Sequence, residues 1–413
     1  MKKALQSSQP KGEASAKSRS ARYERQRTRI VDAAVSLVNE KGVFGMTLQQ
    51  VAQALDLTTT SVTYYYRYKE QLAAAVFEDT IERLAEMVRE AGTEATPFER
   101  VTRYVELYFA QFIRSVRGQE RPLAVLSELR TLEDATKAQL IRRYQDVFRS
   151  LRGFFGNADT IERHRLFSAR AQMLNEALFW SSMWLRHYPA GDLHNVRRRL
   201  LDILENGISA PQAKWELSIV EPDIGIPDDP KRDFLRVATR LINNIGYKGA
   251  SIDRITSEIR VTKGSFYHHL EAKDDLILEC YREDYLRLGR LQRRVEASGG
   301  TTVSRLASGI ASALALQFNG VHPLLRTTAL QAMPEAVRQG AIDRFDRIAR
   351  WLCGILVDGM ADGSIRIIDP LIAGNVIIST INSAYDLRGW AGKQDFEDAI
   401  AIYAGTILTG IID

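Results

Sequence analysis

Residues 251 to 276, SIDRITSEIRVTKGSFYHHLEAKDDL, repeat the pattern of residues 47 to 72, TLQQVAQALDLTTTSVTYYYRYKEQL, at an offset of 204 positions. Only four positions are identical, so identity alone is weak evidence of a repeat. The apolar pattern is stronger, because seven apolar positions coincide without a gap. They are Leu48, Val51, Leu55, Leu57, Val62, Tyr66 and Leu72 in the first stretch, and Ile252, Ile255, Ile259, Val261, Phe266, Leu270 and Leu276 in the second.

Each stretch is predicted to form a short helix, a tight turn, a second short helix and the start of a long third one. This helix-turn-helix arrangement places a helix in the major groove of DNA. Upstream, Ile30, Ala33, Ala34, Leu37 and Val38 repeat at helical spacing, and Phe234, Val237, Ala238, Leu241 and Ile242 follow the same pattern 204 positions later. Both of these helices are expected to end at a glycine in the left-handed conformation, Gly42 and Gly246.

The chain has 413 residues, of which 45% are hydrophobic, which is too long for one ordinary core and favours two domains or more. Helix-forming residues dominate, and an all-α protein is expected. We predict two tandem units with these boundaries: a basic disordered arm over 1–25, helix-turn-helix domains over 26–72 and 230–276, helical regulatory domains over 73–210 and 277–413, and a proline-rich linker over 211–229.

Further helices are expected in both regulatory domains from their apolar spacing. In the first they cover about 97–117, 122–129, 136–155, 160–186 and 192–209, and in the second 303–318, 323–331, 334–362, 370–390 and 394–412.

Positive charge is concentrated at the N-terminus. Nine lysines and arginines precede residue 30, against Glu13 and Glu24, in a segment rich in Ser, Ala and Gln without an apolar face. Such a segment is typical of a solvated disordered tail. It is also typical of a basic arm beside a DNA-reading module, and the two interpretations are compatible because a disordered arm can contact phosphates.

Other features narrow the class of protein. The two cysteines, Cys280 and Cys353, have no metal-ligand spacing and indicate a reducing compartment. No secretory signal or run of 18 apolar residues occurs, so a cytoplasmic protein with no membrane partner is expected. An enzyme is not expected, and neither is a cofactor or a metal. The six histidines are scattered, and the sequence has no nucleophile–base pair, no metal-ligand spacing and no Gly-rich phosphate loop after a strand.

Candidate DNA-binding residues follow from the helix-turn-helix register. Thr47, with Gln50 three residues on, and Ser251 are expected to cap the first short helices, and Thr58 and Thr262 the second. Tyr66 is expected in the core and Tyr64 and Tyr65 outside it. The exposed residues expected to face DNA are Thr59, Thr60, Thr63, Tyr64 and Tyr65 in the first unit and Lys263, Gly264, Tyr267, His268 and His269 in the second.

Two further lysines, Lys69 and Lys273, lie in the first turn of the long third helix, where the positive end of the helix dipole favours an anion such as a phosphate.

The stretch VTKGSFYHHLEAKDDL resembles the DNA-binding signature of TetR-type bacterial transcription regulators, in which a valine, a small hydroxyl residue, Lys-Gly, an aromatic residue, Tyr, a His or aromatic pair and a Lys follow in order. The first copy, LTTTSVTYYYRYKEQL, is similar but has Thr60 in place of the usual glycine and Thr63 in place of the usual tyrosine. These departures suggest that the two copies prefer different base sequences.

The resemblance implies a helical domain that binds a small molecule and dimerises through its last two helices, here 160–186 with 192–209 and 370–390 with 394–412. The two halves would then pair within one chain as a pseudo-dimer, which a covalent link favours, or each with a second chain. An apolar or aromatic effector is expected, and the candidate pocket residues are Tyr104, Tyr108, Phe112, Phe148, Phe318 and Trp351. Aromatic residues at helical spacing are equally typical of a plain core.

The leading hypothesis is a ligand-responsive regulator, expected to be a repressor, that binds double-stranded DNA at a pseudo-palindromic operator. The alternative is a helical sensor or protein-binding module in which one reading head has degenerated.

Overall fold

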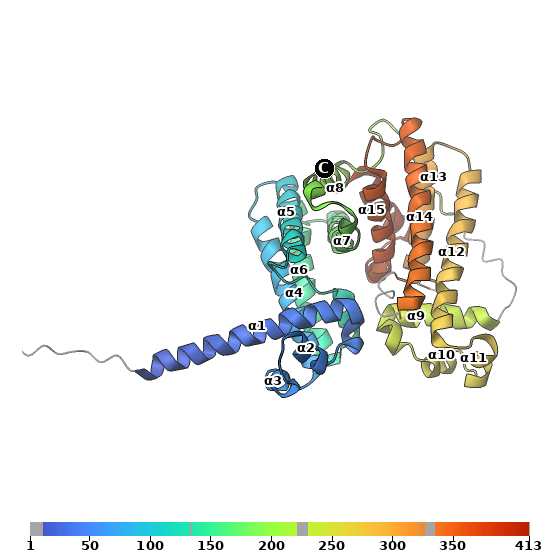
Figure 1. Cartoon of the computed structure of the whole chain (residues 1–413). Helices are drawn as coiled ribbons and strands as arrows, with labels where there is room; N and C mark the ends of the chain where they lie inside the picture. Colours follow the sequence, from blue (N-terminus) through green and yellow to red (C-terminus); the bar gives the residue numbers. More distant parts are fainter. Residues whose placement is uncertain (1–10, 133, 221–229, 321, 327–334, 413) are drawn as a thin grey trace, which may run out of the picture.

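The structure, a computed structural model, describes residues 11–132, 134–220, 230–320, 322–326 and 335–412. Its secondary structure is helical, apart from one isolated bridge that joins Ser209 to Ile365 within the described residues. The prediction of an all-α protein is therefore confirmed. Figure 1 shows two helical halves side by side, with the short helices of both halves at the lower edge of the molecule.

The first half contains eight α-helices in its described part, and their order follows the prediction. They are α1 Lys11–Gly45, α2 Leu48–Ala54, α3 Thr59–Thr63, α4 Lys69–Ala91, α5 Pro97–Val116, α6 Asp134–Arg152, α7 Ile161–Trp184 and α8 Leu193–Asn206. A 3₁₀ helix, η1 Leu126–Thr131, separates α5 from α6.

The second half repeats this order. Its helices are α9 Pro230–Gly249, α10 Ile252–Glu258, α11 Lys263–His269, α12 Lys273–Ala297, α13 Thr302–Asn319, α14 Glu335–Ala361, α15 Pro370–Ser383, α16 Arg388–Ala391 and α17 Phe396–Thr409, with the 3₁₀ helix η6 Ala384–Leu387 between α15 and α16. The helices α2 and α10, and likewise α3 and α11, begin 204 positions apart, so the register read from the sequence is the structural register.

Glycine ends the regular part of the first helix in both halves, as predicted. Gly42 has φ 68° and Gly246 has φ 76°, both in the left-handed region, and the backbone turns there before one last helical turn. A side chain with a Cβ is strained in this conformation, which explains why glycine stands at both positions.

Several predicted boundaries are wrong. Residues 11–25 belong to α1 and are not a disordered arm, while residues 1–10 lie outside the described residues. The stretch 122–129 runs without helix as far as Val125, because it packs as an extended segment across α1, and only then enters η1. Residues 323–326 are likewise not helical, and 327–331 lie outside the described residues. The helix expected over 370–390 is broken at η6.

The two halves pack against each other through the helices that the resemblance assigns to dimerisation. Helix α7 lies against α15 and α17, and α8 also contacts both. Small residues are buried on these helices of the second half, among them Ala373, Ser383 and Ala404, while Gly374 faces α14. Trp184 is buried as well. The structure thus shows the pairing of halves within one chain, the first of the two arrangements considered above.

The hydrophobic cores of the two reading units differ in their continuity. The core of the first unit, with Val51, Val62 and Leu72, is continuous with the core that joins the two regulatory domains. The core of the second unit, around Phe234 and Phe266, forms a separate cluster. The second unit is therefore the more independent of the two.

The beginning of the predicted linker is ordered along the second half. Residues 213–220 have no regular secondary structure, and the backbone N–H groups of Ser218 and Val220 donate hydrogen bonds to the hydroxyls of Ser308 and Ser312 on α13. Residues 221–229 lie outside the described residues.

Candidate DNA-binding surface and effector cavities

Side-chain caps start both short helices of each reading unit. Thr47 accepts from the N–H of Gln50, whose side chain accepts from the backbone of Thr47, which completes the predicted capping box. Ser251 accepts from the N–H of Arg254 without a returning bond. These caps satisfy N–H groups that a helix start leaves free and fix where α2 and α10 begin.

The helices α3 and α11 start in the same way. Thr58 accepts from the N–H of Ser61, and Thr262 accepts from the N–H of Ser265. The two threonines are thus caps of the recognition helices, which leaves their neighbours to face solvent.

The turn between the two short helices contains a feature that the sequence prediction missed. Asp56 and Arg260, again 204 positions apart, have φ 54° and φ 58°, and they are the residues other than glycine with positive φ in the described chain. Few residues adopt this conformation readily. The shared geometry shows that both units use the same tight turn, although Asp and Arg gave no obvious signal for it.

Most predicted reading residues lie on the surface. Tyr64 is 75% exposed and Tyr267 is 56% exposed. Thr47, Thr58, Thr59, Thr60, Thr262, Lys263, Gly264 and His268 are exposed as well. Most of these residues belong to α3 and α11, and Figure 1 places both helices at the lower edge of the molecule. Tyr66 is buried, as expected.

Six predicted DNA-binding residues are only partly exposed: Thr63, Tyr65, Lys69, Ser251, His269 and Lys273. Tyr65 was expected among the exposed residues and is only partly exposed, because its ring lies 4.8 Å from that of Tyr23 on α1. His269 packs 6.0 Å from Phe234. In the opposite sense, Val261 was expected in the core and is 38% exposed.

Lys69 and Lys273 do not point toward an open anion site. The ammonium group of Lys69 donates to the carbonyl of Phe44 at 3.1 Å, and that of Lys273 donates to the carbonyl of Tyr247 and lies over its ring. Each lysine therefore ties the start of the long helix to the end of the first helix, which is a structural reason for their identity in the two copies. The interpretation that they are placed primarily for phosphate needs this correction.

The charged group on α11 also has a protein partner. The ammonium of Lys263 lies 2.6 Å from a carboxylate oxygen of Asp253 on α10. Both side chains are more than half exposed, so the pair is screened by solvent and contributes little to stability. Lys263 is thus held near the reading surface without being buried.

The first half contains a cavity of about 610 Å³. Three of the predicted residues, Tyr104, Tyr108 and Phe112 of α5, line it together with Tyr144 and Trp180. Burial raises the pKa of the Tyr104 and Tyr108 hydroxyls well above the usual range, so both are neutral donors. Phe148 does not line this cavity, because it lies on the outer side of α6 beside Arg142 and Arg149.

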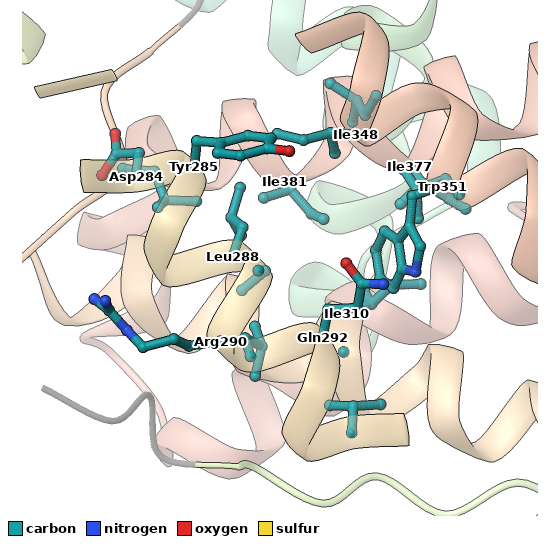
Figure 2. A pocket seen from close by; sticks show the side chains of 18 of the residues that line it. Asp284, Tyr285, Leu288, Arg290, Gln292, Ile310, Ile348, Trp351, Ile377 and Ile381 are labelled. Carbon is teal, nitrogen blue, oxygen red and sulfur yellow. The ribbon is translucent and has the colours of Figure 1, made fainter. Parts of the chain in front are cut away.

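The second half contains a cavity of about 430 Å³ between α12, α13, α14 and α15. Figure 2 shows Tyr285, Leu288 and Gln292 entering from α12 and facing a group of apolar side chains, while Asp284 and Arg290 extend away from the cavity. The labelled apolar residues opposite α12 are Ile310, Ile348, Trp351, Ile377 and Ile381.

Of the two residues predicted here, Trp351 lines the cavity and Phe318 does not. Phe318 packs 6.1 Å from Trp390 and 6.0 Å from Tyr403, in the core between the halves. Tyr285 and Gln292 were missed. Their spacing of seven residues, with Leu288 between them, places them on one face of a helix, and this signal was available in the sequence.

The fold and this surface define a class: helix-turn-helix DNA-binding regulators with two reading units in one polypeptide. Comparisons with known proteins narrow the class further. The family described as "Bacterial regulatory proteins, tetR family" matches residues 30–76 and 234–280, the two reading units. The chain therefore carries the DNA-binding domain of this family twice.

Curated relatives cover parts of the chain. It is 42% identical over 43 residues to the Transposon Tn10 TetC protein of Escherichia coli, which is 10% of this chain and 22% of that protein. It is 25% identical over 139 residues to the HTH-type transcriptional repressor DhaR of Mycobacterium sp. (strain GP1), 33% of this chain and 70% of that one. The HTH-type transcriptional regulator BetI of Rhizobium meliloti (strain 1021) is 26% identical over 123 residues, 30% of this chain and 58% of BetI. The matches thus span less than two thirds of TetC and of BetI.

Two solved structures of AibR are also similar to one half of the chain. Apo AibR is 21% identical with a TM-score of 0.38 and covers 43% of this chain and 98% of its own. AibR in complex with isovaleryl coenzyme A and operator DNA is 22% identical with a TM-score of 0.39, and the match covers 44% of this chain and 98% of that one.

Every helix in the described residues is too short or too polar to cross a lipid bilayer.

Proposed function

We propose that this protein is a ligand-responsive repressor whose two reading units bind the two half-sites of one pseudo-palindromic operator. The observation that carries the proposal is the placement of α3 and α11 at the same edge of one folded chain, with exposed side chains on both. A pseudo-palindrome suits such a molecule because half-site symmetry in DNA mirrors the symmetry of the reading units.

The proposal assigns DNA reading to 26–72 and 230–276 and effector response to 73–210 and 277–413. The linker 211–229 joins the two units, so one chain supplies the two reading units that a dimeric regulator obtains from two subunits. Such a regulator acts where the chromosome is, in the cytoplasm.

The half-sites are expected to differ in sequence. The first unit offers hydroxyl groups from Thr59, Thr60 and Tyr64, whereas the second offers the ammonium of Lys263 and the imidazole of His268. Hydroxyls and ammonium groups favour different base edges, and Gly264 lets the backbone of α11 approach a phosphate more closely than Thr60 allows.

Selection of duplexes from a random-sequence pool by the full chain, followed by footprinting, tests the proposal. Two protected half-sites of unequal sequence are expected. The double variant Thr59→Ala/Thr60→Ala is expected to relax preference in one half-site, and Lys263→Ala/His268→Ala in the other, by roughly 1–3 kcal/mol per lost base contact. Recovery of no preferred duplex would contradict the proposal.

An effector of apolar or aromatic character fits both cavities, which are within the size range of small-molecule sites. Isoleucine, leucine and tryptophan side chains dominate the second cavity, and Tyr285 and Gln292 supply polar groups. Charged residues also line it, among them Arg293, Arg305 and Arg347. Binding that favours a geometry unable to hold DNA requires a coupling free energy of about 1–3 kcal/mol. A thermal-shift screen of apolar and aromatic compounds, repeated with bound duplex, measures this coupling.

The alternative, a sensor with one degenerate reading unit, draws on the first unit. Its recognition helix spans five residues against seven in α11, and Tyr65 is covered by Tyr23. Protection of a single half-site, unaffected by Thr59→Ala/Thr60→Ala, would support this alternative.

Because the halves pair within one chain, the mass of the protein in solution distinguishes a single-chain pseudo-dimer from a homodimer. Light scattering is expected to give the mass of one chain, 46.6 kDa, and one chain per selected duplex. A mass of two chains would favour the homodimer with four reading units.

A further inference from the structure

The described residues of the second half include no helix that corresponds to the long N-terminal part of α1. Helix α9 begins at Pro230, which is equivalent to Gln26, whereas α1 begins at Lys11, so α1 is roughly four turns longer. Figure 1 shows this extension leaving the first unit on the side away from the second half, beyond α2 and α3. We call residues 11–29 the N-terminal extension.

The charge of the extension differs from that of the segment that precedes α9. Residues 11–29 contain seven lysines and arginines and two glutamates. The equivalent residues 215–233, which end in the first turn of α9, contain two basic and six acidic residues. The region before the first reading unit is thus suited to an anionic partner, and the region before the second is not.

Three arginines of the extension lack a carboxylate partner among the described residues, although Arg25 and Arg29 donate local hydrogen bonds to Ala21 and Gln26. Arg22, Arg25 and Arg29 are exposed, and in the described part of the chain no carboxylate pairs with them. Their spacing of three and four residues places them on one face of the helix, where like charges repel each other and destabilise the helix. An external polyanion would relieve this repulsion.

The extension is physically connected to the recognition helix of the first unit. The ring of Tyr23 lies 4.8 Å from that of Tyr65 and 6.3 Å from that of exposed Tyr64. Arg27 donates to the hydroxyl of Tyr66 at 3.1 Å. The extension therefore starts beside the surface that is proposed to read DNA.

We propose that the N-terminal extension is a third DNA-binding element, which binds the phosphate backbone of the duplex that flanks the outer end of the first half-site. The inference rests on the proposed function, because it needs α3 to be seated on DNA. A helix of this length spans about 28 Å, or roughly eight base pairs. The protein thus covers its operator asymmetrically, with longer contact on the side of the first unit.

The test uses the full chain, a duplex that it selects from a random pool, and the triple variant Arg22→Gln/Arg25→Gln/Arg29→Gln. The wild-type footprint is expected to extend beyond the first half-site by up to about eight base pairs, and beyond the second half-site not at all. In the variant the extra protection is expected to disappear. The slope of log K against log salt is expected to fall by up to about 3, with roughly tenfold or greater loss of affinity at 0.1 M salt.

A matched control removes the same charge elsewhere. Arg89→Gln/Arg149→Gln/Arg163→Gln changes three exposed arginines on α4, α6 and α7, and it is expected to leave the footprint unchanged and the salt slope nearly so. Shortening the duplex beside the first half-site is expected to weaken the wild type and not the triple variant, and shortening it beside the second half-site to affect neither. Circular dichroism confirms that the variants fold.

The outcomes separate the two ideas. A symmetric footprint with the same salt slope in wild type and variant would overturn this inference and leave the proposed function standing. The same holds if the extension instead binds vesicles of anionic lipid while the footprint stays symmetric. Failure to select any duplex would overturn both.

Discussion

Asn39 and Asn243, which lie 204 positions apart, make the same pair of hydrogen bonds in the two halves. The amide of Asn39 donates to the carbonyl of Leu123 and accepts from the N–H of Val125, both at 2.9 Å. The amide of Asn243 donates to the carbonyl of Leu324 at 2.9 Å and accepts from the N–H of Arg326 at 3.0 Å. Each asparagine therefore joins the first helix of a reading unit to a segment that also lines the cavity of its half.

This relationship predicts unequal effects of the two alanine variants on stability. Asn243 is 3% exposed, whereas Asn39 is partly exposed, so Asn243→Ala leaves two backbone groups unpaired away from water. We expect Asn243→Ala to lower the free energy of unfolding by about 2–3 kcal/mol and Asn39→Ala by about 1 kcal/mol, measured by urea denaturation. Asn206→Ala, at an exposed helix end, is the control and is expected to cost under about 0.5 kcal/mol. Equal losses for all three would contradict the role of this bond pair.

The position of the 3₁₀ helix η1 between the halves leads us to expect that a change there affects both of them. Although η1 belongs to the first half, it lies against α9 of the second reading unit and also contacts α1. Leu129 is buried in η1, and Leu129→Ala is expected to cost about 2–5 kcal/mol of stability. Under native conditions, hydrogen exchange of the α9 amides is expected to accelerate in this variant. The control is Leu140→Ala, which changes a buried residue of α6 and is expected to accelerate exchange in α9 less. Equal acceleration of α9 exchange in the two variants would show that η1 does not couple the halves.

Asp284 predicts a dependence of stability on pH. Burial raises the pKa of this carboxyl from 3.8 to about 6, against the opposing effects of Arg287 and of the N–H of Leu325. A raised pKa means that the folded state binds the proton more tightly, so this contribution to stability is full below pH 4 and is lost as the pH rises to about 6. The loss amounts to about 3 kcal/mol at most. Asp284→Asn keeps an acceptor for Leu325, and its unfolding free energy is expected to lack this fall between pH 4 and 6; an unchanged profile would refute the assignment.

We expect that Gly410, near the C-terminus, cannot be replaced without a large loss of stability. Gly410 has φ 89°, and a Cβ there would lie 2.2 Å from the carbonyl oxygen of Glu205. The space is this tight because the chain crosses the end of α8, where the N–H of Ile411 donates to the carbonyl of Leu204 at 2.7 Å. Gly410→Ala is expected to lower stability by more than about 3 kcal/mol in thermal or urea unfolding. Gly405→Ala, inside α17 with open space around it, is the matched control and is expected to be neutral or to stabilise by up to about 1 kcal/mol. A tolerated Gly410→Ala would show that the C-terminal crossing can relax.

The sequence by itself determined the features that depend on neighbours along the chain. Apolar spacing located the repeat and its helices, Gly42 and Gly246 marked the left-handed turns, and Thr58 and Thr262 capped the recognition helices. These features are local because a helix face and a cap involve residues within a few positions of each other.

Only the tertiary structure decided the contacts between distant segments. It turned Lys69 and Lys273 toward backbone carbonyls, covered Tyr65 with Tyr23, and moved Phe318 from a cavity wall into the core between the halves. It also paired the halves and continued α1 into the N-terminal extension. A residue's helical register fixes the face on which it lies, but the segment that covers that face comes from elsewhere in the chain, and periodicity carries no information about it.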